Sequence, residues 1–453
     1  MSMHPLIYST AIPPQVRVGR FVADEPRLGW MFPFVKNVPK AELYIVGGTV
    51  RDAVKGLLPQ GLHLVIRHLN LADLQAELQK FGAVSQLNDT TLAFKPRNFK
   101  RDDAIEIAIP VSGQPDPSMP IIHDLGRRDF SVNAMAYSLN TGLIIDPFGG
   151  LRDIQTRTLR TVGRPSARFS ERPLRTLRAL RIAARHAYKI DDGTWRALKD
   201  ELPRLNKLTI NDSGQAEYVI PRQHIGREFL KTLSSQPGYG FKLWDMSGAS
   251  DIFTPELQQL GNIHHRDGVT GLQLAERTLA NLSHPLPSLV FAGLMSHLED
   301  AALSAAKEII VRLHLHSAHP QFSHNDVLWM LQHKNILEDA DPEHLPASQF
   351  EQIFGKTRGR NLLTFLYTVH RASSKHSKTR DRLHKATRRH QQLVTDVKAP
   401  LLRGRDLEAL GVAPGPKYRK ILAKIRDAQL DGHIANQTEA LNFARQLVAA
   451  QAV

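Results

Sequence analysis

Cysteine is absent from this chain of 453 residues. Its absence excludes disulfide bonds, thiolate catalysis and zinc sites built on cysteine ligands. Long apolar runs are missing as well, since no stretch approaches the roughly 18 apolar residues of a membrane span. The N-terminus also lacks a basic start followed by an apolar core. We therefore expect a cytoplasmic protein that does not enter membranes.

Acidic residues are scarce relative to basic ones. The chain has 59 Lys and Arg against 44 Asp and Glu, a net charge of +15 at pH 7. This balance is typical of a protein whose partner is a polyphosphate, above all a nucleic acid. An inert basic surface is the alternative, but clustering counts against it. Between Arg371 and His390 the chain has seven Lys and Arg residues and a single acid, Asp381.

A turn that approaches phosphate is predicted where a short apolar run ends at two glycines. Leu43 to Val46 is typical of a buried strand, and Gly47 and Gly48 follow it directly. The glycines let backbone N–H groups come close to a ligand, and Arg51 adds a planar donor fork. Residues 51–56 can start a helix whose N-terminus favours anions. An ordinary strand-to-helix turn is the alternative at this point.

Four ordered segments carry a resemblance to a known family. They are Gly-Gly-Thr-Val-Arg-Asp at 47–52, the Asp-Leu-Gly-Arg-Arg-Asp-Phe-Ser-Val-Asn run within 124–137, Ile-Asp-Pro-Phe-Gly-Gly at 145–150, and the arginine-rich run at 168–185. Together they resemble the class II tRNA nucleotidyltransferase and bacterial poly(A) polymerase family. The resemblance implies ATP or CTP as a ligand, and Mg²⁺ or Mn²⁺ as a cofactor if the chain is active. The nucleotide-binding residues that it implies are Gly47, Gly48, Arg51, Asp52, Arg128, Asp129, Asn133, Arg172, Arg175 and Arg178.

The chain departs from this family at Gly61 and His63. Residues 61–66 alternate like a second strand, so these two positions should share a face. The family has two carboxylates at this spacing, which hold the Mg²⁺ ions of nucleotidyl transfer. Glycine offers no ligand, and one imidazole suits a softer metal such as Mn²⁺ or Zn²⁺. Glu106, on a predicted strand at 104–109, is the candidate for a surviving catalytic carboxylate. His63 and Glu106 are therefore the candidate metal ligands, and a surface-facing glutamate is the alternative interpretation of Glu106.

A second departure lies in the arginine-rich run. Arg172, Arg175, Arg178, Arg181 and Arg185 are spaced by three or four residues and are predicted to form one stripe of a helix. In the resembled family, an acid at the position of Arg172 and the arginine of position 175 bond to the edges of ATP and CTP. A guanidinium donates hydrogen bonds and cannot accept them. Selection between C and A should therefore be weakened. Pairing of the stripe with acids elsewhere in the protein is the alternative function for these charges.

The resemblance implies an α+β fold. It predicts a nucleotidyltransferase-type head, a small mixed sheet with flanking helices, followed by an all-α neck, body and tail. Residues 1–38, with five prolines and little periodicity, are expected as an extension that is laid over the surface or is partly disordered. The expected parts are an N-terminal extension at 1–38, the head at 39–160, the neck and body at 161–245, a helical, degenerate HD-like domain at 246–395, and a small helical tail at 396–453.

The expected HD-like domain has lost one of its defining acids. His264 to Gly268 and Leu294 to Leu298 resemble the metal-binding segments of HD-type phosphohydrolases. Leu298 stands where the paired aspartate should be, and a working site needs that acid together with several histidines. Hydrolase activity is therefore not expected, and His297 is interpreted as a packed or surface histidine.

Basic residues of the neck, body and tail are the candidates for RNA contact. A tail with a basic face could hold the phosphates of a tRNA acceptor arm. A helical cap with scattered lysines is the alternative. The candidate RNA-binding residues are Arg181, Arg380, Arg382, Lys385, Arg388, Arg389, Lys417, Arg419 and Lys420.

Three hypotheses for the function follow. The first is an RNA-binding protein of this family that has lost catalysis, with tRNA as the foremost partner. The second is an active RNA 3′-end nucleotidyltransferase that adds CCA or A with Glu106 and unusual metal ligands. The third is a regulatory subunit whose head senses a nucleotide. No feature of the sequence indicates a particular protein partner.

Overall fold

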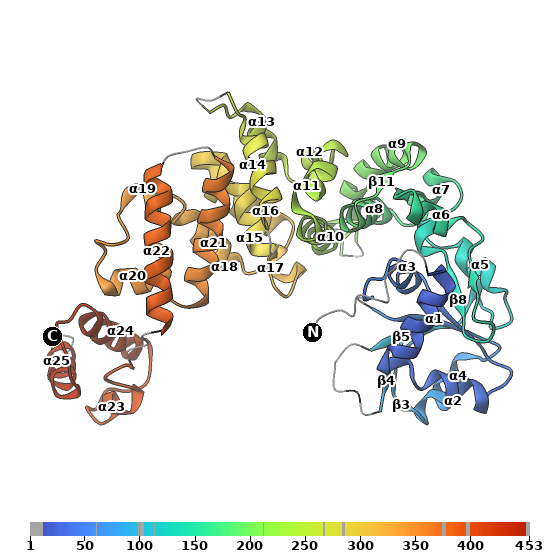
Figure 1. Cartoon of the computed structure of the whole chain (residues 1–453), viewed down its shortest axis with the longest axis horizontal. Coiled ribbons are helices and arrows are strands. Elements are labelled where there is room, and N and C mark those ends of the chain that lie inside the picture. Colours follow the sequence, from blue (N-terminus) through green and yellow to red (C-terminus); the bar gives the residue numbers. More distant parts are fainter. Residues whose placement is uncertain are drawn as a thin grey trace. The chain divides into compact units, whose positions relative to one another are not determined.

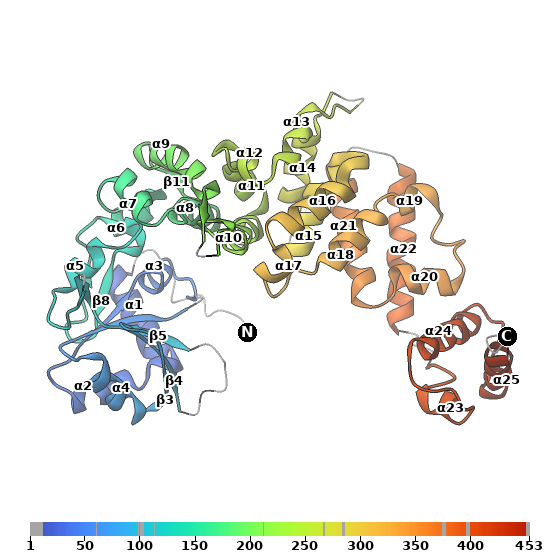
Figure 2. The same ribbon diagram turned by 180° about the vertical axis from the view of Figure 1, so that it is seen from behind.

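The computed structural model describes residues 12–59, 61–97, 99, 104–112, 114–211, 213–265, 268–282, 286–373, 377–395 and 399–449. The chain divides into two compact units, residues 1–220 and residues 221–453 (Figures 1 and 2). The first unit contains the sheet and the second is helical. The domain boundaries expected from the sequence stay predictions, although the structure places its own division at 220/221.

The first unit is built on a mixed sheet, which has seven strands within the described residues. The strand order is β3-β4-β5-β2-β1-β8-β9. The β2 and β5 strands run parallel, and the other neighbouring strands run antiparallel. The α+β fold class is thereby confirmed. The seven strands are β1 (Glu42–Val46), β2 (His63–Arg67), β3 (Gly82–Asn88), β4 (Thr91–Pro96), β5 (Ile105–Ala108), β8 (Ala136–Ser138) and β9 (Ile144–Ile145).

Both faces of the central strands are buried, which explains why their sequences are continuously apolar. Leu43 and Ile45 of β1 belong to the larger core cluster. Tyr44 and Val46, which alternate with them, belong to a second cluster on the other face. The loop of Gly47 therefore leaves the middle of a sheet that is packed on both sides.

Helices cover the sheet and extend the first unit. In Figures 1 and 2, α2 and α4 lie beside β3 and β4 at one end of the sheet. The helices are α1 (Pro14–Asp24), α2 (Met31–Asn37), α3 (Gly48–Val54), α4 (Leu71–Gln79), α5 (Ile121–Gly126), α6 (Gly150–Gln155), α7 (Pro165–Glu171), α8 (Arg175–His186) and α9 (Asp192–Glu201). Short strand pairs complete the unit: β6 (Val111–Ser112) with β7 (Gln114–Pro115), β10 (Thr158–Leu159) with β11 (Lys189–Ile190), and β12 (Leu208–Ile210) with β13 (Ala216–Tyr218).

The N-terminal segment corrects the sequence prediction. Residues 14–37 are not a surface extension, because α1 and α2 insert into the larger core of the head. Val18, Met31 and Phe34 are completely buried there, and Trp30 packs edge-on against Phe34. Of the described prolines, Pro13 and Pro14 stand at the start of α1, Pro26 opens a short 3-10 helix and Pro33 lies in the first turn of α2, where a missing N–H is tolerated.

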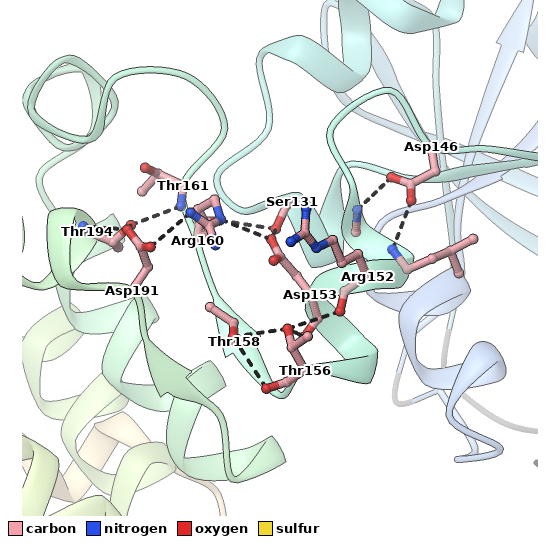
Figure 3. Close-up of polar contacts among 12 residues, drawn as sticks. Ser131, Asp146, Arg152, Asp153, Thr156, Thr158, Arg160, Thr161, Asp191 and Thr194 are labelled. Carbon is pink, nitrogen blue, oxygen red and sulfur yellow. Dashed lines mark hydrogen bonds and ion pairs between the residues drawn. The ribbon is translucent and has the colours of Figure 1, made fainter.

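A polar junction joins the end of the sheet to the helices that follow it (Figure 3). The hydroxyl of Ser131 donates to Asp153 Oδ2 at 2.5 Å, and Arg160 Nε lies 3.5 Å from the same oxygen. Arg160 also pairs with Asp191, just before α9, at 2.9 Å. Because Asp153 is buried, these partners satisfy a carboxylate that would otherwise be costly. The junction connects the start of α9 to Ser131 and to α6.

The second unit is helical in its described residues. Its core is rich in aromatic side chains, and Trp244 packs against both Phe229 and Phe253. A separate cluster of buried side chains, from Leu402 to Ala444, forms the core of the C-terminal part. The helices are α10 (Arg222–Ser235), α11 (Pro237–Met246), α12 (Ala249–Phe253), α13 (Gln259–Asn262), α14 (Gly271–Ala280), α15 (Pro287–Met295), α16 (Ala302–Arg312), α17 (Leu315–Ala318), α18 (His324–Gln332), α19 (Ile336–Asp339), α20 (Ala347–Phe354), α21 (Lys356–Ala372), α22 (Ser377–Thr395), α23 (Gly404–Glu408), α24 (Pro416–Leu430) and α25 (Gln437–Ala449).

In the part of the chain that the structure describes, no helix combines the length and the apolar character that a membrane span requires.

Candidate functional site

The glycine turn brings the backbone close to an arginine. Gly47 follows β1 with φ 72° and ψ −136°, and its N–H donates to Met135 O at 3.1 Å. A Cβ atom at this position would lie 2.8 Å from the NH1 atom of Arg128. Arg128 is held in place by Asp124, with NH2 and Oδ2 2.8 Å apart. Glycine is therefore required here both for its backbone conformation and for the approach of the Arg128 guanidinium.

Arg51 and Asp52 face the interior. Their side chains are nearly fully buried, and Arg51 Nε donates to Asp52 Oδ1 at 2.8 Å. Arg51 NH1 donates to Asn133 Oδ1 at 2.6 Å. Arg185 of α8 approaches Asp52 Oδ2 at 3.4 Å. The donor fork of Arg51 is thus engaged inside the protein, where it joins α3 to the segment of Asn133, while Asp52 joins α3 to α8.

The polar network continues from Asn133 to an exposed arginine. Asn133 Nδ2 donates to Asp129 Oδ1 at 3.0 Å, and Asp129 Oδ2 pairs with Arg178 Nε at 2.8 Å. The Asp129 side chain is 8% exposed and that of Arg178 is 50% exposed. Burial acts to raise the pKa of Asp129, but Arg178 and hydrogen bonds from Asn133 and Phe130 hold that pKa below its ordinary value. The buried carboxylate therefore stays ionised and orients a guanidinium that remains open to solvent.

The two positions that lack carboxylates lie side by side. A Cβ atom on Gly61 would lie 3.2 Å from His63 Nε2, so both positions project to one side of the backbone. Gly61 precedes β2 instead of lying within it, which corrects the predicted start of that strand. Thr49 anchors the segment, because its hydroxyl donates to Gly61 O at 3.1 Å and accepts from His63 N at 3.2 Å. The sequence prediction did not single out Thr49, although it lies inside the glycine motif.

Glu106 is the carboxylate that meets His63. The two residues are register partners in the parallel strands β2 and β5, and His63 Nδ1 lies 3.1 Å from Glu106 Oε2. Both side chains are about half exposed. The hydrogen bond from His63 holds the pKa of the Glu106 carboxyl below its ordinary value against the effect of burial, and the charge of Arg178 adds to this. Glu106 thus belongs to the same surface as Arg178.

The donor set at this surface does not fit a clamp for two Mg²⁺ ions. Gly61 has no side chain to supply a carboxylate oxygen, and the Glu106 carboxylate is hydrogen-bonded to an imidazole. Within the described ranges, no group of three or more His, Cys, Asp or Glu side chains is arranged to hold a metal. One imidazole and one carboxylate could hold a single ion of a softer metal.

The arginine-rich run is broken at Arg172. Helix α7 ends at Glu171, and α8 begins at Arg175. Arg172 is extended, with φ −144° and ψ 90°, because Pro173 restricts the residue before it. Arg172 is therefore not on the predicted stripe, which corrects the sequence prediction. It is an exposed residue of the connection between the helices.

The Arg175 side chain is restrained by contacts where α7 ends and α8 begins. Its NH1 atom pairs with Glu171 Oε2 at 2.8 Å and donates to Arg168 O at 3.0 Å. Its NH2 atom donates to Arg127 O at 3.0 Å. The acid next to Arg172 in the chain thus contacts Arg175. The sequence analysis missed this role of Glu171, although an acid four residues before Arg175 indicates an ion pair.

The basic residues of helix α22 in the second unit fall into two groups: some bond to other parts of the protein, and others are exposed. Arg382 donates to the carbonyls of Leu337 and Glu338, both at 3.0 Å. Lys385 pairs with Glu343 at 3.1 Å. Arg389 NH1 donates to three carbonyls between residues 342 and 345, and its guanidinium lies 4.4 Å from the ring centroid of Phe350. The candidate RNA-binding residues that are exposed are Arg380, Arg388, Lys417, Arg419 and Lys420.

The predicted HD-like segment contains a buried histidine. His297 Nε2 lies 2.7 Å from the hydroxyl of Thr278, and burial lowers its pKa to about 3. Leu298, at the expected position of the acid, is also buried. His297 is thus a packed residue, and the relation to HD-type domains stays a prediction. Arg266 and Asp267 of this segment lie outside the described residues.

The sheet, the glycine turn and the arginine-bearing helix define a nucleotidyltransferase-type head. The profile of the poly(A) polymerase head domain matches residues 43–160, and that of tRNA nucleotidyltransferase domain 2 matches residues 358–444. The chain belongs to the tRNA nucleotidyltransferase and poly(A) polymerase family.

Curated relatives agree with this assignment. The chain is 32% identical over 237 residues to the multifunctional CCA protein of Xanthomonas campestris pv. campestris, a match over 50% of this chain and 53% of the relative. It is 30% identical over 197 residues to the CCA-adding enzyme of Enterococcus faecalis, with 38% and 44% of the two chains covered. The matched region thus spans about half the length of these curated relatives.

The fold is similar to solved structures over nearly the whole chain. The CCA-adding enzyme of Bacillus stearothermophilus in complex with CTP superposes with a TM-score of 0.64 at 21% identity, over 97% of this chain and 99% of the other. The Thermotoga maritima CCA-adding enzyme complexed with tRNA gives a TM-score of 0.57 at 20% identity, over 96% and 98% of the two chains. At these identities the similarity concerns the fold.

Proposed function

We propose that this protein binds a nucleoside triphosphate and the 3′ end of an RNA, tRNA foremost, and that its metal-dependent transfer step is strongly weakened. The pairing of His63 with Glu106 carries this proposal. Nucleotidyl transfer needs metal ions that neutralise the triphosphate and the attacking oxygen. Loss of about 5 kcal/mol of that stabilisation would slow the reaction by more than about a thousandfold.

The binding part of the proposal rests on the cations around the turn. The guanidinium of Arg128 lies against Gly47, and Arg178 projects from the buried carboxylate of Asp129 while remaining half exposed. Both can donate to phosphate oxygens without leaving their own ion pairs. Arg51 and Asp52 act one layer deeper, where they hold α3 against α8. Their role in the proposed site is positioning.

Base selection should be loose in the proposed site. Arg175, which Glu171 and two carbonyls restrain, can present a donor to a base. Arg172 adds only further donors, and it lies outside the helix. No acceptor is supplied by Arg172 for the exocyclic amine of cytosine or adenine. We therefore expect ATP and CTP to bind with similar affinity.

A second candidate function is RNA 3′-end nucleotidyl transfer with an unusual metal. The observation that favours it is again the pair of His63 and Glu106, because an imidazole and a carboxylate at this distance are suitable ligands for one Mn²⁺ ion. The His63 side chain would turn from Glu106 towards the metal in that case. Any activity should then depend on Mn²⁺ and on Glu106.

One experiment separates these hypotheses. The purified full chain is incubated with a tRNA that lacks its 3′ CCA, with labelled ATP and CTP, and with Mg²⁺ or Mn²⁺. Glu106→Gln is compared with Glu77→Gln, a carboxylate on the surface helix α4 of the same unit. Binding of nucleotide and tRNA without extension supports the first proposal. Extension in Mn²⁺ that Glu106→Gln abolishes and Glu77→Gln leaves intact overturns it and supports the second. Binding of nucleotide without tRNA supports a nucleotide-sensing subunit instead.

A further inference from the structure

An open cleft lies between the two long helices α21 and α22. These helices pack side by side in the second unit (Figures 1 and 2). The cleft has a volume of about 490 Å³, within the range of sites that accept a small ligand or one nucleotide. The residues that line it include Arg360, Leu363, Thr364, Tyr367, Thr387 and Gln391.

An exposed aromatic ring is among the side chains that line this cleft. Tyr367 is 49% exposed, which is unusual for so large a side chain on a packed helix. Arg360, Thr364 and Arg371 are spaced from it by three, four or seven residues, so they lie along the same face of α21. Arg371 NH1 donates to the Tyr367 hydroxyl at 3.3 Å, and its guanidinium lies 5.9 Å from the ring centroid. Arg371 therefore restrains the ring and leaves about half of it open to solvent.

The side of the cleft that α22 forms is polar, and the buried histidine on this side is held by a hydrogen bond. Thr387 and Gln391 are one turn apart on α22, so their side chains lie on one face. His390 is buried, and its Nδ1 atom lies 2.6 Å from Phe354 O. The Thr387 hydroxyl donates to Leu383 O at 2.8 Å and can accept a further hydrogen bond, whereas the amide of Gln391 can both donate and accept, as the edge of a nucleobase requires.

Positive charges lie in the cleft, at Arg360, and beside its exposed ring, at Arg371. Arg360 lies at one end of the tyrosine face, and Arg371 lies at the other, eleven residues or about 16 Å along the helix axis. Exposed Arg380 lies seven residues before Thr387 and so shares its face of α22. Among the described residues that line the cleft, none is acidic. Cations at the ends of an aromatic groove are complementary to a phosphate backbone that crosses it.

We propose that this cleft binds one unpaired nucleotide of an RNA strand. The base stacks on the open face of Tyr367, Thr387 and Gln391 bond to its edge, and Arg360 and Arg371 hold the flanking phosphates. This proposal rests on the RNA binding proposed above, and it adds a second contact in a different unit from the nucleotidyltransferase-type head. Stacking on an aromatic ring is tolerant of sequence, so the cleft should accept any base.

The test uses the full chain and a short single-stranded oligoadenylate that carries one 2-aminopurine, whose fluorescence is quenched by stacking. Binding of a tRNA without its CCA end is measured in parallel. Tyr367→Ala should lower the affinity for both RNAs at least about fivefold and abolish the quenching, since one base stack contributes about 1–3 kcal/mol. Tyr367→Phe should bind within about twofold of the wild type, because it keeps the ring. Arg371→Gln should reduce the slope of log affinity against log salt by about one.

Val311→Ala is the control for a change at an exposed apolar site of the same unit. Thermal unfolding establishes that each variant is folded. If Tyr367→Ala binds both RNAs as the wild type does, or if Tyr367→Phe loses as much affinity as Tyr367→Ala, the cleft is not a stacking site, whereas RNA binding itself stands. If the wild-type chain binds neither RNA, the proposed function fails together with the cleft.

Discussion

The imidazole Nδ1 atom of His63 lies 3.1 Å from the carboxylate Oε2 atom of Glu106, across the parallel strands β2 and β5. This contact joins the position of a missing metal ligand to the candidate carboxylate that remains. The carboxylate of Glu106 is thus already paired with a neighbouring side chain. The proposed loss of metal-dependent chemistry follows from this pairing as well as from the missing acids.

Restoring both acids should restore metal binding. We expect the double substitution Gly61→Asp and His63→Asp to bind Mg²⁺ and to add labelled CTP or ATP to a tRNA without its CCA, at a rate at least about a hundredfold above the wild type. The single variant Gly61→Asp should gain less, because its side chain would lie against His63 Nε2. Magnesium titration and primer extension measure the two effects. A folded double variant without Mg²⁺ affinity would show that more than these two acids is missing.

The Asp129 carboxylate should stabilise the first unit above acidic pH. Its pKa is lower in the folded protein than in the unfolded chain, so the stabilisation is present above about pH 4 and is lost as the pH falls below that value. Asp129→Asn should lower the free energy of unfolding by about 1–3 kcal/mol near neutral pH. Denaturant titrations at about pH 7 and about pH 3 should show a smaller difference at the acidic pH. An equal difference at both would contradict the ionised state of Asp129.

His186 should make the first unit sensitive to acid. Burial, with the positive charges of Arg51, Lys55 and Arg185, lowers the pKa of His186 to about 2. The unfolded chain therefore binds a proton below about pH 6.5 and the folded chain does not, so stability falls with decreasing pH by at most about 1.4 kcal/mol per unit.

The substitution His186→Asn tests this, because the amide can still accept a hydrogen bond from Lys55, which lies 3.1 Å from His186 Nδ1. Unfolding free energies between about pH 7 and about pH 5 should decline less steeply in this variant. His123→Asn, at an exposed histidine of the same unit, is the control. A decline as steep as that of the wild type would mean that His186 does not carry the acid sensitivity.

Two adjacent arginines of α22, Arg388 and Arg389, should differ in their effects on stability and on tRNA binding. Arg389 donates to three carbonyls and stacks on Phe350, so Arg389→Ala should lower the free energy of unfolding by about 1–3 kcal/mol. Arg388 is exposed, so Arg388→Ala should leave the stability within about 0.5 kcal/mol and reduce the salt dependence of tRNA binding. Thermal unfolding and binding at two salt concentrations measure both. Similar effects of the two substitutions on stability would argue against this division.

Local motifs predicted the head well. The apolar run before Gly47, the order of the later motifs and the alternation of the strands are short-range signals, and they led to the correct fold class. The break at Arg172 could have been predicted too, since Pro173 restricts the residue before it. The helices of residues 14–37 were missed because the prolines were interpreted as a sign of irregular chain, whereas Pro14 and Pro26 stand at helix starts.

The sequence by itself determined which chemical groups are available: glycines at the turn, no side chain at position 61, an imidazole at position 63 and a large excess of arginine. The tertiary structure decided which of those groups are already engaged. Arg51 is satisfied inside the protein by Asn133, 82 positions away, and Arg389 by carbonyls more than 40 positions earlier in the chain. Contacts at such separations depend on how the elements pack, so local sequence patterns do not reveal them.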